Sequence, residues 1–72
     1  ELSPKLRSIV TVTALMTQGG FEQLGYHLTT AKKNGVTKDE IAEIITHAAF
    51  YVGWPKAWSA FSQAKTIWTD ED

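Results

Sequence analysis

Apolar residues recur every three or four positions along most of the chain, which is the spacing that places them on one face of an α-helix. The clearest pattern runs from Lys38 to Val52. At roughly 100° per residue its apolar side chains fall within about 80° of arc, and they are Ile41, Ile44, Ile45, Ala48 and Val52. We therefore predict a helix over 38–52 with this stripe as its core face. Phe50 points almost directly away from that face.

This helix carries signals at both of its ends. Thr37 is a natural N-cap, and Glu40, three residues later, can reach back to the Thr37 amide and complete a capping box. Val36 and Ile41 occupy the two positions of a hydrophobic staple. At the other end, we expect Gly53 to adopt a left-handed conformation and stop the helix.

A first helix is predicted from Ser3 and Pro4, as N-cap and first helical residue, to about Gln18. The β-branched run 9–13 would also suit a strand. The chain offers no second strand to pair with it, so we favour the helix.

Two further helices complete the pattern. After a break at Gly19 and Gly20, one helix has an apolar stripe of Phe21, Leu24, Leu28 and Ala31 and closes with Lys32, Lys33 and Gly35. The chain restarts at Trp54-Pro55 as a last helix, with Pro55 at the N1 position. The apolar stripe of this helix is Ala57, Phe61, Ala64 and Trp68. We expect the acidic end 70–72 to fray, because it lies at the negative end of the helix dipole.

The sequence therefore predicts an all-α fold, a small antiparallel domain of about four helices covering residues 1–72. A monomer of this size buries only about 60% of the surface that its unfolded chain exposes. The chain nevertheless carries three Trp, three Phe and two Tyr. We expect part of this apolar surface, including Phe50, to meet other copies in an interlocking homo-oligomer.

Charge and composition exclude several classes of function. The formal net charge is −1 with both signs spread along the chain, which argues against nucleic-acid partners. The longest apolar stretch, around 48–54, is far short of the ~20 residues of a membrane span, so no membrane partner is expected. The absence of cysteine excludes disulfides and thiol nucleophiles, and we expect a cytoplasmic protein. Because residue 1 is Glu rather than Met, we also expect that an N-terminal part is missing.

Few side chains could carry chemistry. His27 lies roughly 90° from the centre of its helix's apolar stripe, where it can line a cleft and exchange protons near neutral pH. His47 forms a second border stripe with Glu40, Ile44 and Tyr51. Arg7 could hold a substrate carboxylate in a fixed fork. For each of these side chains a structural or interfacial role is the alternative.

Other chemistry is not indicated by the sequence. The two histidines and scattered carboxylates have no metal-ligand spacing, so no metal is expected. No serine lies in the sequence context of a known nucleophile.

Several short motifs, in order and spacing, resemble the carboxymuconolactone decarboxylase family. They are Arg7, His27-x3-Ala31-x3-Gly35, Val36-Thr37, Glu40-Ile41-x-Glu43 and Tyr51-x-Gly53-x-Pro55-x-Ala57. The resemblance extends from about Leu2 to Trp68. It implies an all-helical fold whose subunits interlock into ring-like trimers or hexamers, and a domain usually preceded by an N-terminal portion.

The resemblance also implies an activity, the decarboxylation of a small unsaturated lactone carboxylic acid in aromatic degradation. No cofactor is expected, because the substrate itself can accept the electrons that carbon dioxide leaves behind. Arg7 would orient a carboxylate and His27 would deliver a proton. Glu43, His47, Tyr51 and Trp54 are expected to bind the substrate.

Two alternatives remain open. The related alkylhydroperoxidase D-like proteins carry a Cys-x-x-Cys pair four residues before a histidine that aligns with His27. Gly20 and Gln23 occupy the two cysteine positions here, so thiol-based peroxide reduction lacks its reacting atom. The other alternative is a non-catalytic oligomeric module that binds a small ligand or a protein.

Overall fold

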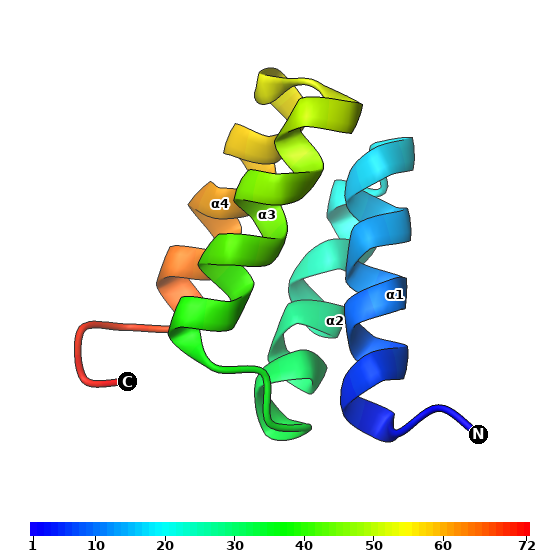
Figure 1. Cartoon of the computed structure of the whole chain (residues 1–72). Helices are drawn as coiled ribbons and strands as arrows, with labels where there is room; N and C mark the ends of the chain where they lie inside the picture. The colour runs from blue at the N-terminus through cyan, green and yellow to red at the C-terminus, as the bar shows by residue number, and fades with distance from the viewer.

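Four α-helices, joined by short turns, form two antiparallel hairpins in the computed structural model, which describes residues 1–72 (Figure 1). The helices are α1 (Pro4–Gln18), α2 (Phe21–Lys33), α3 (Lys38–Val52) and α4 (Trp54–Ile67). Helix α1 packs mainly on α2, and α3 mainly on α4. The hairpins then meet through α2 against α4 and, more sparsely, through α1 against α3. The predicted four-helix all-α fold is confirmed.

Helix α1 begins as its sequence indicates. The Ser3 hydroxyl accepts a hydrogen bond from the Leu6 amide over 3.1 Å, and Pro4 is the first helical residue. The β-branched run 9–13 is helical throughout, so the strand alternative is wrong. Helix α1 ends at Gly19, which has a left-handed φ of 80°.

Helix α2 ends in a Schellman motif. The Val36 amide donates to the Ala31 carbonyl, and the Gly35 amide donates to the Lys32 carbonyl. Gly35 has a φ of 103°, which suits glycine, and both Ala31 and Val36 are buried. The turn therefore brings Val36 into the core directly before α3.

The predicted bounds of α3, and its capping box, are confirmed. The Glu40 amide donates to the Thr37 hydroxyl over 3.1 Å, and the Thr37 amide donates to the Glu40 carboxylate over 2.9 Å. Gly53 ends α3 with a positive φ of 97°, but its ψ of 145° is extended rather than left-handed helical. The reason is that α4 starts at the next residue, so Gly53 is at once the C-cap of α3 and the N-cap of α4. Pro55 is consequently the second residue of α4.

The core contains most residues of the stripes predicted for α2, α3 and α4, and also Val12 and Met16 of α1, for which no stripe was predicted. Its largest fully buried side chains are Met16, Leu24, Leu28, Val12 and Val36. Ala57, Ala60 and Ala64 are the buried residues within α4, and their small size lets the neighbouring helices approach closely. Phe61, predicted in the α4 stripe, stays 37% exposed at the edge of the core.

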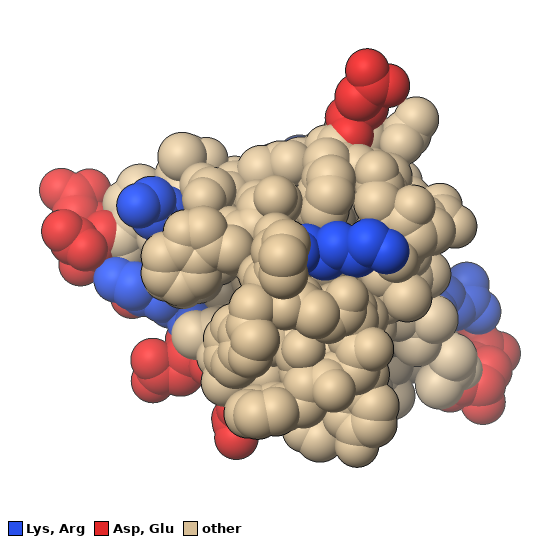
Figure 2. Space-filling view, turned by 90° about the horizontal axis from the view of Figure 1, so that it is seen from above, with Lys and Arg blue, Asp and Glu red and all other residues tan.

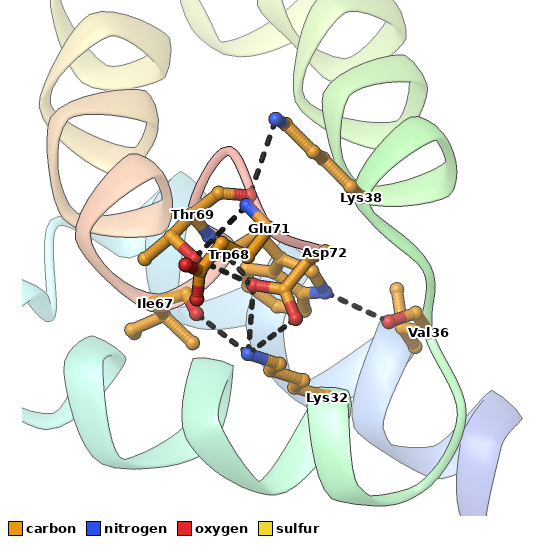
Figure 3. A network of polar contacts seen from close by, with 8 residues as sticks. All are labelled: Lys32, Val36, Lys38, Ile67, Trp68, Thr69, Glu71 and Asp72. Carbon is orange, nitrogen blue, oxygen red and sulfur yellow. Dashed lines mark hydrogen bonds and ion pairs between the residues drawn. The ribbon is translucent and has the colours of Figure 1, made fainter.

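The acidic end of the chain lies outside α4, which ends at Ile67, but it makes contacts that the sequence did not indicate. Asp72 pairs with Lys32 at 2.9 Å and accepts a hydrogen bond from the Thr69 amide. Lys32 also donates to the Ile67 carbonyl over 2.9 Å, so its ammonium group neutralises both the end of α4 and the acidic side chain (Figure 3). Lys38 donates to the Thr69 carbonyl from the other side.

Large apolar side chains remain on the surface. Phe50 is 74% exposed, as its position on α3 predicts, and Tyr51 and Trp58 are also exposed. Seen from the end where α3 joins α4, the molecule presents a broad area with few charged side chains (Figure 2). None of the four helices combines the length and apolar content of a membrane-spanning helix.

Candidate active site

A groove between α1 and α3 has the largest number of converging polar groups on the chain. Its volume is about 450 Å³. Its lining combines apolar and polar side chains. The apolar residues are Ile9, Ile44 and Ala48, and the polar residues are Thr13, Glu40, Glu43 and His47. An apolar cleft with a few titratable groups is the usual form of a small-molecule site.

Helix geometry places the polar groups of this groove. Glu43 and His47 are four residues apart on α3 and so lie on the same side of the helix. One turn further on, the ring of Tyr51 lies against that of His47, with centroids 5.4 Å apart. From α1, the Thr13 hydroxyl donates its proton to the Ile9 carbonyl over 2.8 Å, which leaves its oxygen to accept from a ligand.

Glu40 closes one end of the groove and is held as an anion. The backbone hydrogen bond from Thr37, and then the hydrogen bond and charge of Lys5 at 2.9 Å, lower the pKa of the Glu40 carboxyl below its ordinary value. Glu40 and Lys5 therefore form an ion pair and neutralise each other. Glu43 and His47 make no hydrogen bond or ion pair through their side chains, so they are the free titratable groups of the groove.

The two residues predicted to be catalytic lie elsewhere. His27 is half-buried on α2, as expected from its border position, and its ring meets the edge of the Tyr26 ring at 5.1 Å. Asn34, two turns later on the same side of α2, donates to the Ser8 hydroxyl, so this side of α2 faces α1. Arg7 is exposed on α1 without an ion pair. Neither Arg7 nor His27 lines the α1–α3 groove.

The predicted substrate-binding residues divide between two places. Glu43 and His47 share the groove, and the ring of Tyr51 lies next to that of His47 at a tilt of 47°. Trp54 instead contacts the ring of Phe50 at 5.5 Å and lines a smaller cavity between α3 and α4. The structure therefore groups Glu43, His47 and Tyr51 and separates Trp54 from them.

Sequence reasoning missed the contribution of α1 to the groove. Ile9 and Thr13 are four residues apart, and this spacing does indicate a shared helix face. Which helix that face opposes depends on the packing of the two hairpins, for which the sequence has no local signal. No three His, Asp or Glu side chains are grouped as ligands of a metal ion.

Comparison with known proteins settles the family. A model of the carboxymuconolactone decarboxylase family matches residues 1–66. The chain belongs to this family. The resemblance seen in the short motifs is thereby confirmed over most of the chain, and the family member described here carries no cysteine.

Two curated relatives are similar to this chain. A 4-carboxymuconolactone decarboxylase from Acinetobacter baylyi (strain ATCC 33305 / BD413 / ADP1) is 39% identical over 64 residues, which cover 89% of this chain and 48% of the relative. Nitrosuccinic acid decarboxylase npaB from Metarhizium robertsii (strain ARSEF 23 / ATCC MYA-3075) is 43% identical over 54 residues, covering 75% of this chain and 38% of the relative. The chain thus spans about half the length of these family members or less.

Proposed function

We propose that this chain acts in the cofactor-independent decarboxylation of a small carboxylic acid. The observation that carries the proposal is that both relatives, with different named substrates, are decarboxylases. An unsaturated lactone and a nitro group have one property in common, which is that each can accept an electron pair from a neighbouring carbon. We infer that the substrate of this chain carries such a group, with an unsaturated lactone acid as the first candidate.

The reaction asks little of the protein besides positioning and a proton. The bond between the carboxylate and its carbon breaks, the electron pair moves into the acceptor group, and a proton then adds to a carbon of the substrate. In our proposal the guanidinium of Arg7 holds a carboxylate or the developing anionic oxygen. The imidazolium of His27 supplies the proton. Glu43, His47, Tyr51 and Trp54 are proposed to line the substrate site.

In our proposal the site is shared between copies of the chain. Within one chain Arg7 and His27 lie outside the groove that holds Glu43 and His47. We propose that a homo-oligomer, a trimer or hexamer, brings the two sets together. Exposed apolar side chains flank the groove on both sides, Leu6 and Val10 on α1 and Phe50 and Tyr51 on α3. A neighbouring copy seated on these side chains would cover the groove and exclude water from it.

The first test is an activity assay on the intact protein with 4-carboxymuconolactone and nitrosuccinic acid, following release of carbon dioxide. Turnover of either acid supports the proposal. Turnover of neither, by a protein that is folded and oligomeric, contradicts it and favours a non-catalytic binding module.

A second test examines the role of His27 and whether it shares a site with Glu43 of another copy. We expect His27→Gln to reduce turnover by about 10²–10⁴-fold, the usual value of a general acid. If the site is shared between copies, mixing unfolded His27→Gln and Glu43→Gln chains and refolding them together restores part of the activity that each variant lacks. Full turnover by His27→Gln alone would remove this residue from the mechanism.

A third test addresses assembly. We expect gel filtration at micromolar concentration to give a mass several times that of the 8.0 kDa chain. Elution as a monomer would contradict the shared site.

A further inference from the structure

A second apolar groove follows the seam between α3 and α4, on the flank of α3 opposite to the candidate active site. It consists of two adjoining cavities of about 230 and 250 Å³. Both cavities are lined by Ile45 of α3 and Phe61 of α4, so they lie next to each other along the seam. Helices α3 and α4 lie side by side along this seam (Figure 1). We call these two cavities together the α3–α4 trough.

One edge of α4 supplies the apolar wall of the trough. Trp54, Trp58 and Phe61 follow one another at helical spacing, and all three side chains are exposed, by 53%, 66% and 37%. The rings of Trp58 and Phe61 are stacked, with centroids 5.6 Å apart. The facing wall on α3 contains the small residues Ala42 and Thr46, which leave the aromatic faces uncovered.

Charged groups of both signs lie at the other end of the trough, where the C-terminal end of α4 lies beside the N-terminus of α3 and Lys65 is the cation without a partner. Lys65, one turn after Phe61, lines it and makes no hydrogen bond or ion pair. Lys38 also lines it and is the first residue of α3, so the positive end of the α3 dipole lies here as well. Lys38 donates to the Thr69 carbonyl (Figure 3) and lies 3.6 Å from Asp70, whose side chain is fully exposed. Asp39 is the one acidic side chain in the lining itself.

We propose that the α3–α4 trough binds an elongated amphiphilic carboxylate. The carboxylate group lies between Lys65 and the N-terminus of α3, and the apolar chain runs over Phe61 and Trp58 towards Trp54. The seven helical steps from Lys65 back to Trp58 correspond to ~10 Å along the helix axis. A fatty acid of medium chain length, such as octanoate, matches this span. The inference does not depend on decarboxylation, because Lys65, Phe61 and Trp58 are not among the residues proposed for the decarboxylase site, although Trp54 is.

The negative charge of the carboxylate distinguishes this ligand from a neutral molecule with the same alkyl chain. An alkyl chain alone would gain the same burial against the aromatic rings. A free ammonium group and a helix N-terminus add an attraction that only the anion can use. The same length of chain with a neutral head should therefore bind less tightly.

Calorimetric titration of the intact protein with octanoate and with 1-octanol, both below the concentration at which they aggregate, tests the proposal. We expect saturable binding of octanoate to one site per chain, with weaker binding of 1-octanol. Covering Trp54 and Trp58 should shift tryptophan fluorescence to shorter wavelength in parallel with the heat.

Two matched charge reversals locate the head group. Lys65→Glu should weaken octanoate binding about fivefold or more, from loss of one exposed attraction and gain of a repulsion. Lys33→Glu makes the same change in net charge at an exposed position that lines no cavity, and should alter the affinity by less than about twofold. Ala42→Phe, which fills the trough from α3, should abolish binding of both molecules.

Several results would overturn the proposal. They are equal affinity for octanoate and 1-octanol, equal effects of the two charge reversals, and the absence of saturable binding. Absence of binding in an oligomer whose tryptophan fluorescence is already shifted would assign the trough to contacts between copies. Octanoate binding by a protein without decarboxylase activity would support this inference while contradicting the proposed function.

Discussion

The indole N–H of Trp68 donates to the Val36 carbonyl over 2.9 Å and joins the end of α4 to the turn that precedes α3. The two residues are 32 positions apart, and both are buried. Trp68 thus fills the core with its ring and satisfies a buried carbonyl with its nitrogen. The Trp68 side chain therefore links the end of the second hairpin to the turn between the two hairpins.

Trp68→Phe should reveal the value of this hydrogen bond. The smaller ring retains much of the packing but leaves the Val36 carbonyl without its donor, at a cost of about 1–3 kcal/mol in the free energy of unfolding. Urea denaturation followed by circular dichroism measures the change. Trp58→Phe is the matched control, because Trp58 is 66% exposed and should change stability by less than about 0.5 kcal/mol. Equal losses from the two variants would contradict the role given to Trp68.

Thr37→Ala should remove one half of the capping box of α3. The Glu40 amide then has no hydroxyl to donate to, and we expect a loss of about 1 kcal/mol in stability. Thr29→Ala provides the comparison, since Thr29 is an exposed threonine within α2 that donates only to the Gly25 carbonyl. Because alanine favours helix interiors, Thr29→Ala should leave the stability unchanged or raise it slightly. Thermal unfolding of the two variants side by side distinguishes a capping effect from a general loss of threonine.

Substitution of asparagine at two glycines should have unequal effects. Gly19 has the left-handed conformation that asparagine tolerates, with φ 80° and ψ 23°. Gly53 has φ 97° and ψ 145°, a combination that is essentially restricted to glycine. Gly53→Asn should therefore cost about 1–3 kcal/mol, and Gly19→Asn clearly less. A larger loss at Gly19 than at Gly53, measured by chemical denaturation, would contradict this ordering.

Acid should weaken the fold through two carboxylates. Hydrogen bonds from Thr37 and Lys5 lower the pKa of Glu40 below its ordinary 4.5, and hydrogen bonds from Lys32 and Thr69 lower the pKa of Asp72 below its ordinary 3.8. A carboxyl group with a lowered pKa in the folded state adds stability above its unfolded pKa, and this stability is lost as the pH falls through the folded value.

The loss should therefore begin below about pH 4.5 for Glu40 and below about pH 3.8 for Asp72. Glu40→Gln and Asp72→Asn should each flatten the dependence of Tm on pH in this window while having little effect on its slope between pH 6 and 8. High salt should reduce the difference in pH dependence between each variant and the unaltered protein, because both ion pairs are partly exposed to solvent. An unchanged pH profile in both variants would mean that these pairs contribute nothing to stability.

The helices could be predicted closely because their signals are local. Thr37 and Glu40 meet within one helical turn, and Ser3 and Pro4 need only Leu6 to form a cap. The contacts at the end of the chain could not be predicted, for the opposite reason. Lys32 and Asp72 are 40 residues apart, and only the packing of α2 beside α4 brings them within 2.9 Å.

The candidate site shows the same limit. The spacing of Glu43 and His47 on one side of α3 was predictable, whereas the opposing Ile9 and Thr13 depend on how one hairpin is placed on the other. The exposure of Phe50 followed from the helical wheel, because it depends on the position of the residue within one helix. Catalytic roles for Arg7 and His27 remain predictions, because within one chain these side chains do not share a cavity with Glu43 and His47.

A single residue, Gly53, joins α3 to α4. Gly53 caps both helices, so the last turn of α3, with Tyr51 beside His47, lies directly next to the start of α4. The groove and the α3–α4 trough therefore lie on opposite flanks of one helix and have no lining residue in common.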